Sequence, residues 1–178
     1  MKLLRVDFWL KGTHVNNAVS LSQLDAIFFD FDGVFTDNHV WVDERGIESV
    51  KCSRGDGLAL AAFFSSVEFA SWRGIVAVIS TETNPVVEAR CTKMRLKAFL
   101  GTSNKLTFVR EAFPSLDLKR VAFVGNDVND LELGSSVGHF ICPSDAHPAV
   151  LGCADIILSK RGGDSAVRDF LETKLKVS

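Results

Sequence analysis

The 178-residue sequence lacks a strong net charge, a long apolar run and any closely spaced pair of cysteines. Its 20 basic and 22 acidic residues give a net charge of −2, so we expect no nucleic-acid-binding surface and no membrane association. No apolar stretch approaches the roughly 20 residues that cross a bilayer, and the N-terminus has no signal-peptide core. The four cysteines show no CxxC spacing, which indicates reduced thiols. We therefore expect a cytoplasmic protein.

The chain also lacks internal repeats and low-complexity segments. Its composition, 47% hydrophobic and 24% charged, is typical of a folded globular protein. This length supports one sizeable hydrophobic core but not two comfortable ones. We expect a lead-in segment over residues 1–24, followed by a single domain over residues 25–178.

Short apolar runs alternate with helical patterns from residue 25 onward. The runs are too continuous for half-exposed strands, which favours a parallel sheet covered on both faces. Alternation of strands and helices predicts a doubly wound α/β fold. The expected strands are 25–29, 74–80, 120–125 and 154–159, and the expected helices are 56–66, 85–95, 104–113, 128–135 and 164–174.

One block departs from this alternation. Residues 38–53 alternate apolar and polar side chains around "DERG", which predicts a β-hairpin that projects from the sheet. No insertion large enough for a separate cap domain follows. The hairpin or a neighbouring subunit would therefore have to close a pocket at the sheet edge.

Acidic and amide side chains follow two of the expected strands. Asp30 and Asp32 follow the first, and Asn126, Asp127 and Asp130 follow the strand at 120–125. In a parallel sheet, ligands bind beyond the carboxyl ends of the strands, so these groups should meet at one edge. Oxygen donors without histidine or cysteine favour a hard cation, which we expect to be Mg²⁺.

Four motifs in this order resemble those of the haloacid dehalogenase superfamily of phosphohydrolases. They are "DFDGVFT" (30–36), "ISTETN" (79–84), Lys105 in "GTSNK" and "GNDVND" (125–130). The resemblance covers about residues 25–170. It implies a Rossmann-like phosphatase domain that uses magnesium.

The resemblance also implies a role for each matching residue. Asp30 would attack phosphorus and form an aspartyl-phosphate, while Asp32 would act as general acid and then general base. Thr81, or Ser80 beside it, would hydrogen-bond phosphate oxygens, and Lys105 would balance their charge. Metal contacts would come from the Asp30 carboxylate, the Asp32 backbone carbonyl and the "GND" loop.

The "GND" loop departs from the family pattern. The residue after the glycine is usually an aspartate that binds the metal, and here it is Asn126. An amide oxygen can still bind a cation but carries no charge. Which of Asn126, Asp127 and Asp130 holds the ion stays open.

A narrower resemblance is to phosphatases of 3-deoxy-2-ulosonic sugar acids. It rests on the hairpin, on "RGDGLAL" (54–60) and on "RGGDSAVRDF" (161–170), although Ser165 and Asp169 differ from the usual tail. The group includes the 3-deoxy-D-manno-octulosonate 8-phosphate enzymes and the ketodeoxynonulosonate or neuraminate 9-phosphate enzymes. It forms homotetramers in which the hairpin and tail of one subunit cover the neighbour's site.

The residue after Thr81 favours one substrate within this group. Octulosonate enzymes usually have arginine there, whereas Glu82 resembles the nonulosonate 9-phosphate enzymes. Glu82 could accept hydrogen bonds from sugar hydroxyls, and Arg90 could pair with the substrate carboxylate. Lys93 shares a helix face with Arg90. An exposed basic helix face explains the same spacing.

Two further interpretations remain. One is a broader sugar-phosphate phosphatase. The other is a non-catalytic or weakly catalytic oligomerisation domain, of the kind found behind sialic-acid cytidylyltransferases. Residues 1–24 and Asn126 favour the second, while the intact set of motif residues opposes it.

Overall fold

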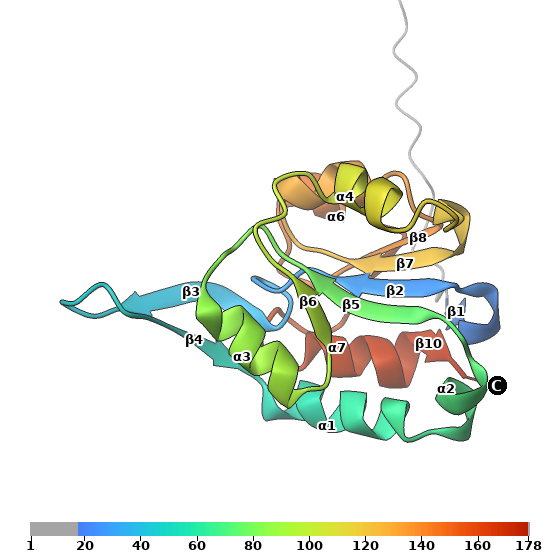
Figure 1. Cartoon of the computed structure of the whole chain (residues 1–178), viewed down its shortest axis with the longest axis horizontal. Helices are drawn as coiled ribbons and strands as arrows, with labels where there is room; N and C mark the ends of the chain where they lie inside the picture. Colours follow the sequence, from blue (N-terminus) through green and yellow to red (C-terminus); the bar gives the residue numbers. More distant parts are fainter. Residues whose placement is uncertain (1–17, 178) are drawn as a thin grey trace, which may run out of the picture.

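The computed structural model describes residues 18–177, and its central feature is a six-stranded parallel sheet (Figure 1). The strand order is β6-β5-β2-β7-β8-β9, the doubly wound order in which the direction of winding reverses between β2 and β7. The fold class predicted from the sequence is confirmed. The strands are β2 (Ala26–Phe29), β5 (Ile75–Ile79), β6 (Lys97–Phe99), β7 (Val121–Val124), β8 (His139–Cys142) and β9 (Ile156–Ile157).

The sheet is buried on both faces, as the continuous apolar runs require. In β2, Ala26 and Phe28 face one hydrophobic core, while Ile27 and Phe29 face the other. Helices α1, α3 and α7 cover the face of Ile27, and α4, α5 and α6 cover the face of Phe28. Their bounds are α1 (Arg54–Phe64), α3 (Pro85–Lys93), α4 (Lys105–Ala112), α5 (Leu131–Gly134), α6 (Pro148–Leu151) and α7 (Ala166–Asp169).

Side-chain caps fix the starts of the helices nearest the strand ends. Ser53, Asn84 and Asn104 each accept a backbone N–H from the first turn of α1, α3 and α4. Pro85 occupies the first position of α3, where its missing N–H has no partner to lose. The caps of α3 and α4 place Thr81 and Lys105 close to the edge where β2 ends.

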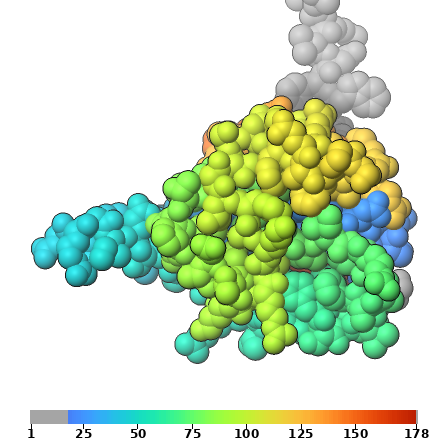
Figure 2. Space-filling model, in the orientation of Figure 1, coloured from blue at the N-terminus to red at the C-terminus, as the bar shows by residue number. Residues whose placement is uncertain are grey.

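The predicted hairpin is present and projects from the body of the molecule (Figure 2). Strands β3 (Thr36–Val42) and β4 (Glu48–Cys52) pair antiparallel. At its turn, Asp43 Oδ1 accepts hydrogen bonds from the backbone N–H groups of Arg45 and Ile47. Gly46 takes a positive φ of 76° there, which a residue without Cβ adopts easily.

The two ends of the described chain lie together. Strand β1 (Val19–Ser20) pairs in parallel with β10 (Leu175–Lys176), and Val19 and Leu24 are buried in the core. Residues 18–24, which the sequence analysis assigns to the lead-in, therefore pack on the same body as the sheet. Residues 1–17 of that segment lie outside the described residues.

Several shorter elements were missed or misplaced by the sequence analysis. Strands β6 and β8 and helix α2 (Val67–Ser71) were not predicted. The helix expected over 128–135 is a 3₁₀ turn, η3 (Val128–Asp130), followed by α5. The helix expected over 164–174 begins at Ala166 and continues as a π-helix, η4 (Phe170–Lys174). Within residues 18–177, no helix is long and apolar enough to span a bilayer.

Candidate active site

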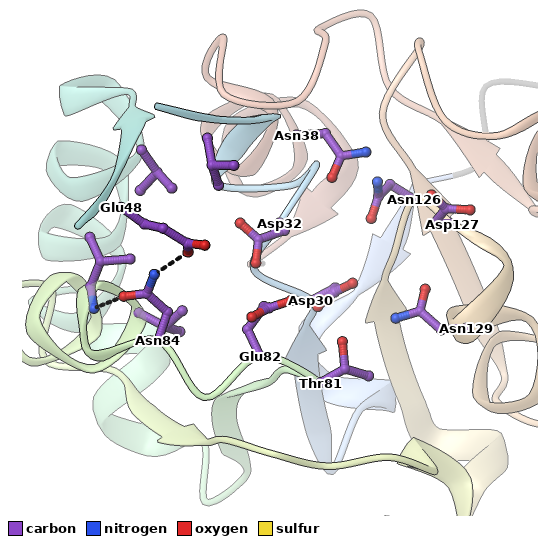
Figure 3. Close-up of a pocket in the computed structure, with 14 residues that line it drawn as sticks. Asp30, Asp32, Asn38, Glu48, Thr81, Glu82, Asn84, Asn126, Asp127 and Asn129 are labelled. Atoms are coloured by element: carbon purple, nitrogen blue, oxygen red, sulfur yellow. Dashed lines mark hydrogen bonds between the residues drawn. The ribbon is translucent and has the colours of Figure 1, made fainter. Parts of the chain in front are cut away.

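A pocket of about 290 Å³ opens at the carboxyl ends of β2 and β7, the two strands at the switch point (Figure 3). The chain just after β2 is held against the end of β7 there, because the Asp30 N–H donates to the Val124 carbonyl across a distance of 2.8 Å. The hairpin and the start of α3 complete the wall. The polar residues that line the pocket are Asp30, Asp32, Asn38, Glu48, Thr81, Glu82, Asn84, Asn126, Asp127 and Asn129.

Asp30 lies at the base of this pocket and is 4% exposed. Its Oδ1 accepts hydrogen bonds from the Phe31 N–H at 2.7 Å and from Lys105 Nζ at 2.8 Å. Burial, reinforced by the nearby charge of Asp130, raises the pKa of Asp30 to about 8 despite Lys105. A further positive charge in the pocket would favour the ionised, nucleophilic form.

Lys105 and Asp130 form a buried pair behind Asp30. Lys105 Nζ lies 2.6 Å from Asp130 Oδ1, and neither side chain is more than 1% exposed. The other oxygen of Asp130 accepts the backbone N–H groups of Asn126 and Asp127. Asp130 does not line the pocket, so this geometry suits a residue that holds Lys105 and the loop in place better than a metal ligand.

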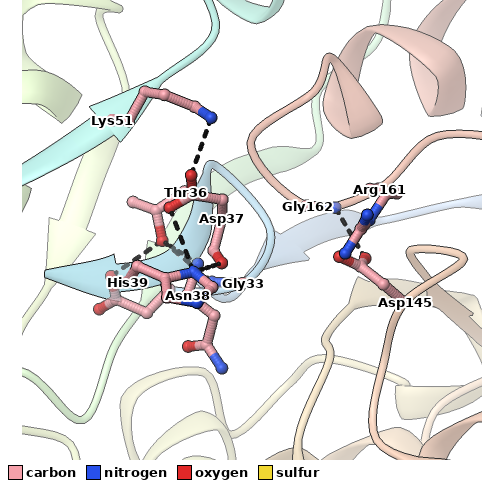
Figure 4. Close-up of polar contacts among 10 residues, drawn as sticks. Gly33, Thr36, Asp37, Asn38, His39, Lys51, Asp145, Arg161 and Gly162 are labelled. Carbon is pink, nitrogen blue, oxygen red and sulfur yellow. Dashed lines mark hydrogen bonds and ion pairs between the residues drawn. The ribbon is translucent and has the colours of Figure 1, made fainter.

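Asp32 is held by Thr36 from the start of the hairpin. The Thr36 hydroxyl donates to Asp32 Oδ1 at 3.2 Å and accepts the N–H groups of Gly33 and Asn38 (Figure 4). Burial raises the pKa of Asp32, and the charges of Glu82 and Glu48 add to this effect. A carboxyl group whose pKa is raised in this way is better suited to protonate a leaving alkoxide.

Asn126 presents an unsatisfied oxygen at the same place. Its Oδ1 is buried and has no hydrogen-bond partner, although a buried polar atom without a partner is costly. A Cβ on Gly33, which has a φ of 74°, would lie 1.8 Å from Asn126 Nδ2, so only glycine allows this approach. An unpartnered oxygen in the pocket that Asp30 also lines fits a ligand for a hard cation.

No three histidine, cysteine, aspartate or glutamate side chains gather closely enough in residues 18–177 to hold a metal ion on their own. A cation here would depend on the Asn126 amide and on backbone carbonyls as well as on Asp30. Asp127 also lines the pocket, and its Oδ1 accepts the Val128 N–H. The available donors are therefore charged and neutral oxygens, the ligand type that Mg²⁺ prefers.

The loop after β5 brings two of its three candidate residues into the pocket. Thr81 and Glu82 line it. Ser80 is 1% exposed, and its hydroxyl accepts the Glu82 N–H at 3.1 Å. Thr81 is therefore the hydroxyl available to a phosphate, and Ser80 shapes the turn that carries it.

Arg90 and Lys93 do not line this pocket. Arg90 Nη2 donates to the Ser53 carbonyl at 2.8 Å, at the start of α1, and its buried Nε has no partner. Lys93 is exposed at the end of α3. The structure therefore does not bring these two candidates together with Asp30 within one chain.

Glu48 and Asn84 were missed as site residues. Glu48 lies on β4 and accepts a hydrogen bond from Asn84 Nδ2 through Oε2 (Figure 3). Asn84 is also the N-cap of α3. No local pattern distinguishes Glu48, because its place in the pocket depends on how the hairpin leans against α3.

The tail of the same chain supports the loop that carries Asp32. A Cβ on Gly162 would lie 2.1 Å from the Gly33 carbonyl oxygen, and the Gly163 N–H donates to the Val34 carbonyl. Asp145 accepts the Gly162 N–H and pairs with Arg161 (Figure 4). Two glycines therefore let the tail pack directly on the backbone between Gly33 and Thr36.

Known proteins share this architecture and much of this sequence. A crystal structure from Streptomyces avermitilis, assigned to the HAD family of hydrolases, is 36% identical, with a TM-score of 0.77 over 88% of this chain and 87% of that chain. The chain belongs to the haloacid dehalogenase (HAD) family of hydrolases. No family model matches the chain.

Several relatives of this chain have a named activity, and they are phosphatases. The curated 3-deoxy-D-manno-octulosonate 8-phosphate phosphatase of Salmonella typhi is 29% identical over 92% of this chain and 85% of its own length. The cobalt-bound deoxy-D-mannose-octulosonate 8-phosphate phosphatase of Haemophilus influenzae is 25% identical, with a TM-score of 0.72 over 85% of this chain and 87% of that one. The chain is therefore a phosphatase of the HAD family, as the four motifs predict.

Proposed function

We propose that this HAD phosphatase hydrolyses the phosphate ester of a 3-deoxy-2-ulosonic sugar acid and depends on Mg²⁺. The observation that carries the proposal is the contact between Asp30 Oδ1 and Lys105 Nζ at the base of a pocket that Asp32 and Thr81 also line. The names of the relatives support the class of substrate.

In the proposed reaction, a carboxylate oxygen of Asp30 attacks phosphorus and the ester oxygen leaves with the proton of Asp32. Asp32, now ionised, then takes a proton from water, and the resulting hydroxide attacks the aspartyl-phosphate. Inorganic phosphate leaves and Asp30 is regenerated. In both steps, Lys105 offsets the negative charge of the phosphate, and the Thr81 hydroxyl donates a hydrogen bond to a phosphate oxygen.

Asp30, the Asp32 carbonyl and the Asn126 amide oxygen would hold Mg²⁺, with Asp127 as the remaining candidate. The ion would neutralise the charges of Asp30 and the phosphate so that two anions can approach. The unpartnered Oδ1 of Asn126 supports this assignment. Asp130 is better explained as the partner of Lys105.

Among the sugar acids, we propose nonulosonate 9-phosphate ahead of octulosonate 8-phosphate. Glu82 lines the pocket at the position where the octulosonate enzymes usually have arginine. The test is a panel of octulosonate 8-phosphate and the two 9-phosphates with the native protein and Glu82→Arg. A strong preference of the native protein for the octulosonate ester would contradict this choice.

We further propose a homotetramer built through the hairpin. Trp41, Val42 and Ile47 are 64%, 59% and 54% exposed, which is unusual for apolar side chains on one small element. Neither Arg90 nor Lys93 lines the pocket of its own chain. Either residue could therefore contact a substrate carboxylate only in the pocket of a second copy. Light scattering of the native protein and of Trp41→Glu tests the assembly, and an unchanged mass would contradict the role of the hairpin.

Phosphate release from 4-nitrophenyl phosphate with Mg²⁺ tests the chemistry. We expect turnover by the native protein and its loss, by a factor of at least about 1,000, in Asp30→Asn, since the nucleophile is removed. If neither protein is active and the native mass is still that of a tetramer, the oligomerisation-domain interpretation is correct. Equal activity in both would overturn the role of Asp30.

A further inference from the structure

Glu48 reaches the pocket from the hairpin of its own chain and is fixed there. Its Oε2 accepts from Asn84 Nδ2, while Asn84 Oδ1 accepts the Val86 N–H at 3.0 Å as the cap of α3. The carboxylate is thus anchored to a helix end through one intermediate residue. Its second oxygen, Oε1, has no hydrogen bond to another residue within 18–177, so it stays available to a ligand.

The charge around this wall is of one sign. Five carboxylates line the pocket, and among the described residues no lysine, arginine or histidine does. Lys105 is already bonded to Asp30 and Asp130. A cation bound at Asp30 and Asn126 would compensate the base of the pocket more than Glu48, which lies further away beside Asn84 at the start of α3 (Figure 3).

We propose that Glu48 determines substrate specificity by accepting hydrogen bonds from hydroxyl groups on the carbon chain next to the phosphate ester. Glu82 also lines the pocket and would accept hydrogen bonds from hydroxyl groups on the same carbon chain of the substrate. Hydrogen bonds to a charged acceptor are among the stronger ones, so a polyhydroxylated chain gains affinity here. A second anionic group close to the phosphate is repelled, which excludes such esters.

This inference rests on the proposed function and deepens it. A sugar acid phosphorylated at the far end of its chain carries its carboxylate several carbons from the phosphate. The hydroxyl-bearing carbons nearest the phosphate then meet Glu48, and the carboxylate lies outside the acidic wall. Small esters whose carboxylate adjoins the phosphate would place two anions against it.

The test compares Glu48→Gln with Glu44→Gln in an Asp30→Asn background, so that ligands are bound but not consumed. Glutamine keeps an oxygen for Asn84 and removes the charge. Glu44 is an exposed carboxylate at the hairpin turn that does not line the pocket, which makes it a matched control. Calorimetry with Mg²⁺ measures the binding of glucitol 6-phosphate, a polyol ester, and of 3-phosphoglycerate, whose carboxylate lies near the phosphate.

We expect Glu48→Gln to weaken glucitol 6-phosphate binding about tenfold, the loss of one charge-assisted hydrogen bond, and to strengthen 3-phosphoglycerate binding severalfold. Glu44→Gln should change neither. The inference is overturned if polyol binding stays within about twofold, if both ligands weaken alike, or if the polyol ester does not bind. Absence of turnover in the native protein would instead refute the proposed function, since the binding comparison needs no catalysis.

Discussion

The ammonium nitrogen of Lys105 lies 2.8 Å from Asp30 Oδ1, and the lysine side chain is 1% exposed. A buried carboxylate at a strand end would be costly alone, and a buried lysine equally so. Together with Asp130 they form a set of charges that is tolerated only as a whole. The proposed nucleophile and the residue proposed to neutralise phosphate are therefore one structural unit.

Lys105→Met tests this unit, because methionine keeps most of the volume and removes the charge. Asp30 and Asp130 would then face each other without compensation. We expect aryl phosphate turnover to fall at least about 100-fold and the free energy of unfolding to drop by about 3 kcal/mol. Phosphate release and urea unfolding measure the two effects. Lys119→Met, a substitution at an exposed position, serves as the control and should change neither turnover nor stability. A Lys105→Met protein that is as active and as stable as the native one would show that Asp30, Lys105 and Asp130 do not depend on one another.

Thr36→Val should impair Asp32 without removing it. The substitution deletes the hydroxyl that donates to Asp32 and accepts from Gly33 and Asn38, and it leaves buried polar groups unpaired. We expect kcat to fall about tenfold and the free energy of unfolding to fall by about 1–2 kcal/mol. Thr36→Ser should restore both, because serine keeps the hydroxyl. Steady-state kinetics measure kcat, and urea unfolding measures the stability of each variant. If Thr36→Ser is as impaired as Thr36→Val, the packing of the threonine methyl group matters and the hydroxyl does not.

Asn126→Asp should keep or strengthen the dependence on Mg²⁺. The new carboxylate adds charge where an amide oxygen has no partner, so the ion should bind at least as tightly. Asn126→Ala removes that oxygen and should raise the Mg²⁺ concentration needed for half-maximal activity about tenfold or more. Titration of activity with Mg²⁺ measures both. A sharp loss of turnover in Asn126→Asp would show that another residue holds the ion.

Asp56 should make the protein less stable as the pH rises. Its side chain is 0% exposed, and its Oδ2 has no hydrogen-bond partner. Burial raises its pKa from about 3.8 to about 6, although the hydrogen bond that its Oδ1 accepts from the Arg168 N–H lowers the pKa in part. The folded state therefore holds the proton more tightly than the unfolded state. Stability from this group is complete below about pH 3.8 and is lost as the pH passes 6, on the order of 3 kcal/mol.

Asp56→Asn isolates this effect, because the amide oxygen can still accept the Arg168 N–H but cannot ionise. In urea unfolding from pH 5 to pH 8, the free energy of unfolding of the variant should increase relative to that of the native protein as the pH rises. This difference should reach a plateau above about pH 7. Glu44→Gln serves as the control and should show no such trend. A difference that is constant with pH would mean that Asp56 is ionised in the folded state from the start.

Local sequence patterns were sufficient to predict a strand, and the residues at its end, where one continuous apolar run forms the whole strand. Asp30 and Asn126 were placed at a common edge because the apolar runs before them are uninterrupted, as strands buried on both faces require. Strand β6 was missed because it is three residues long, and its residues are only partly buried or exposed. Strand β8 is as long as β2 and β7, but it begins with the polar His139, so its apolar run is only three residues long.

Contacts between distant elements could not be predicted. Glu48 enters the pocket only because the hairpin leans against the start of α3, 36 residues further along the chain. Asp130 looks like a metal ligand in the sequence, yet the folded loop turns it toward Lys105. Arg90 was expected at the substrate, but the carbonyl at the start of α1 binds its guanidinium group. Each outcome depends on packing that no short segment encodes.

The contact of Gly162 and Gly163 with the backbone of Gly33 and Val34 has a consequence for biosynthesis. The strand and loop bearing the proposed nucleophile are synthesised well before the two glycines that pack against this loop. A nascent chain that has not yet reached Gly162 carries every proposed catalytic side chain but lacks this support for their arrangement. Enzyme activity should therefore arise only after Gly162 and Gly163 have been added.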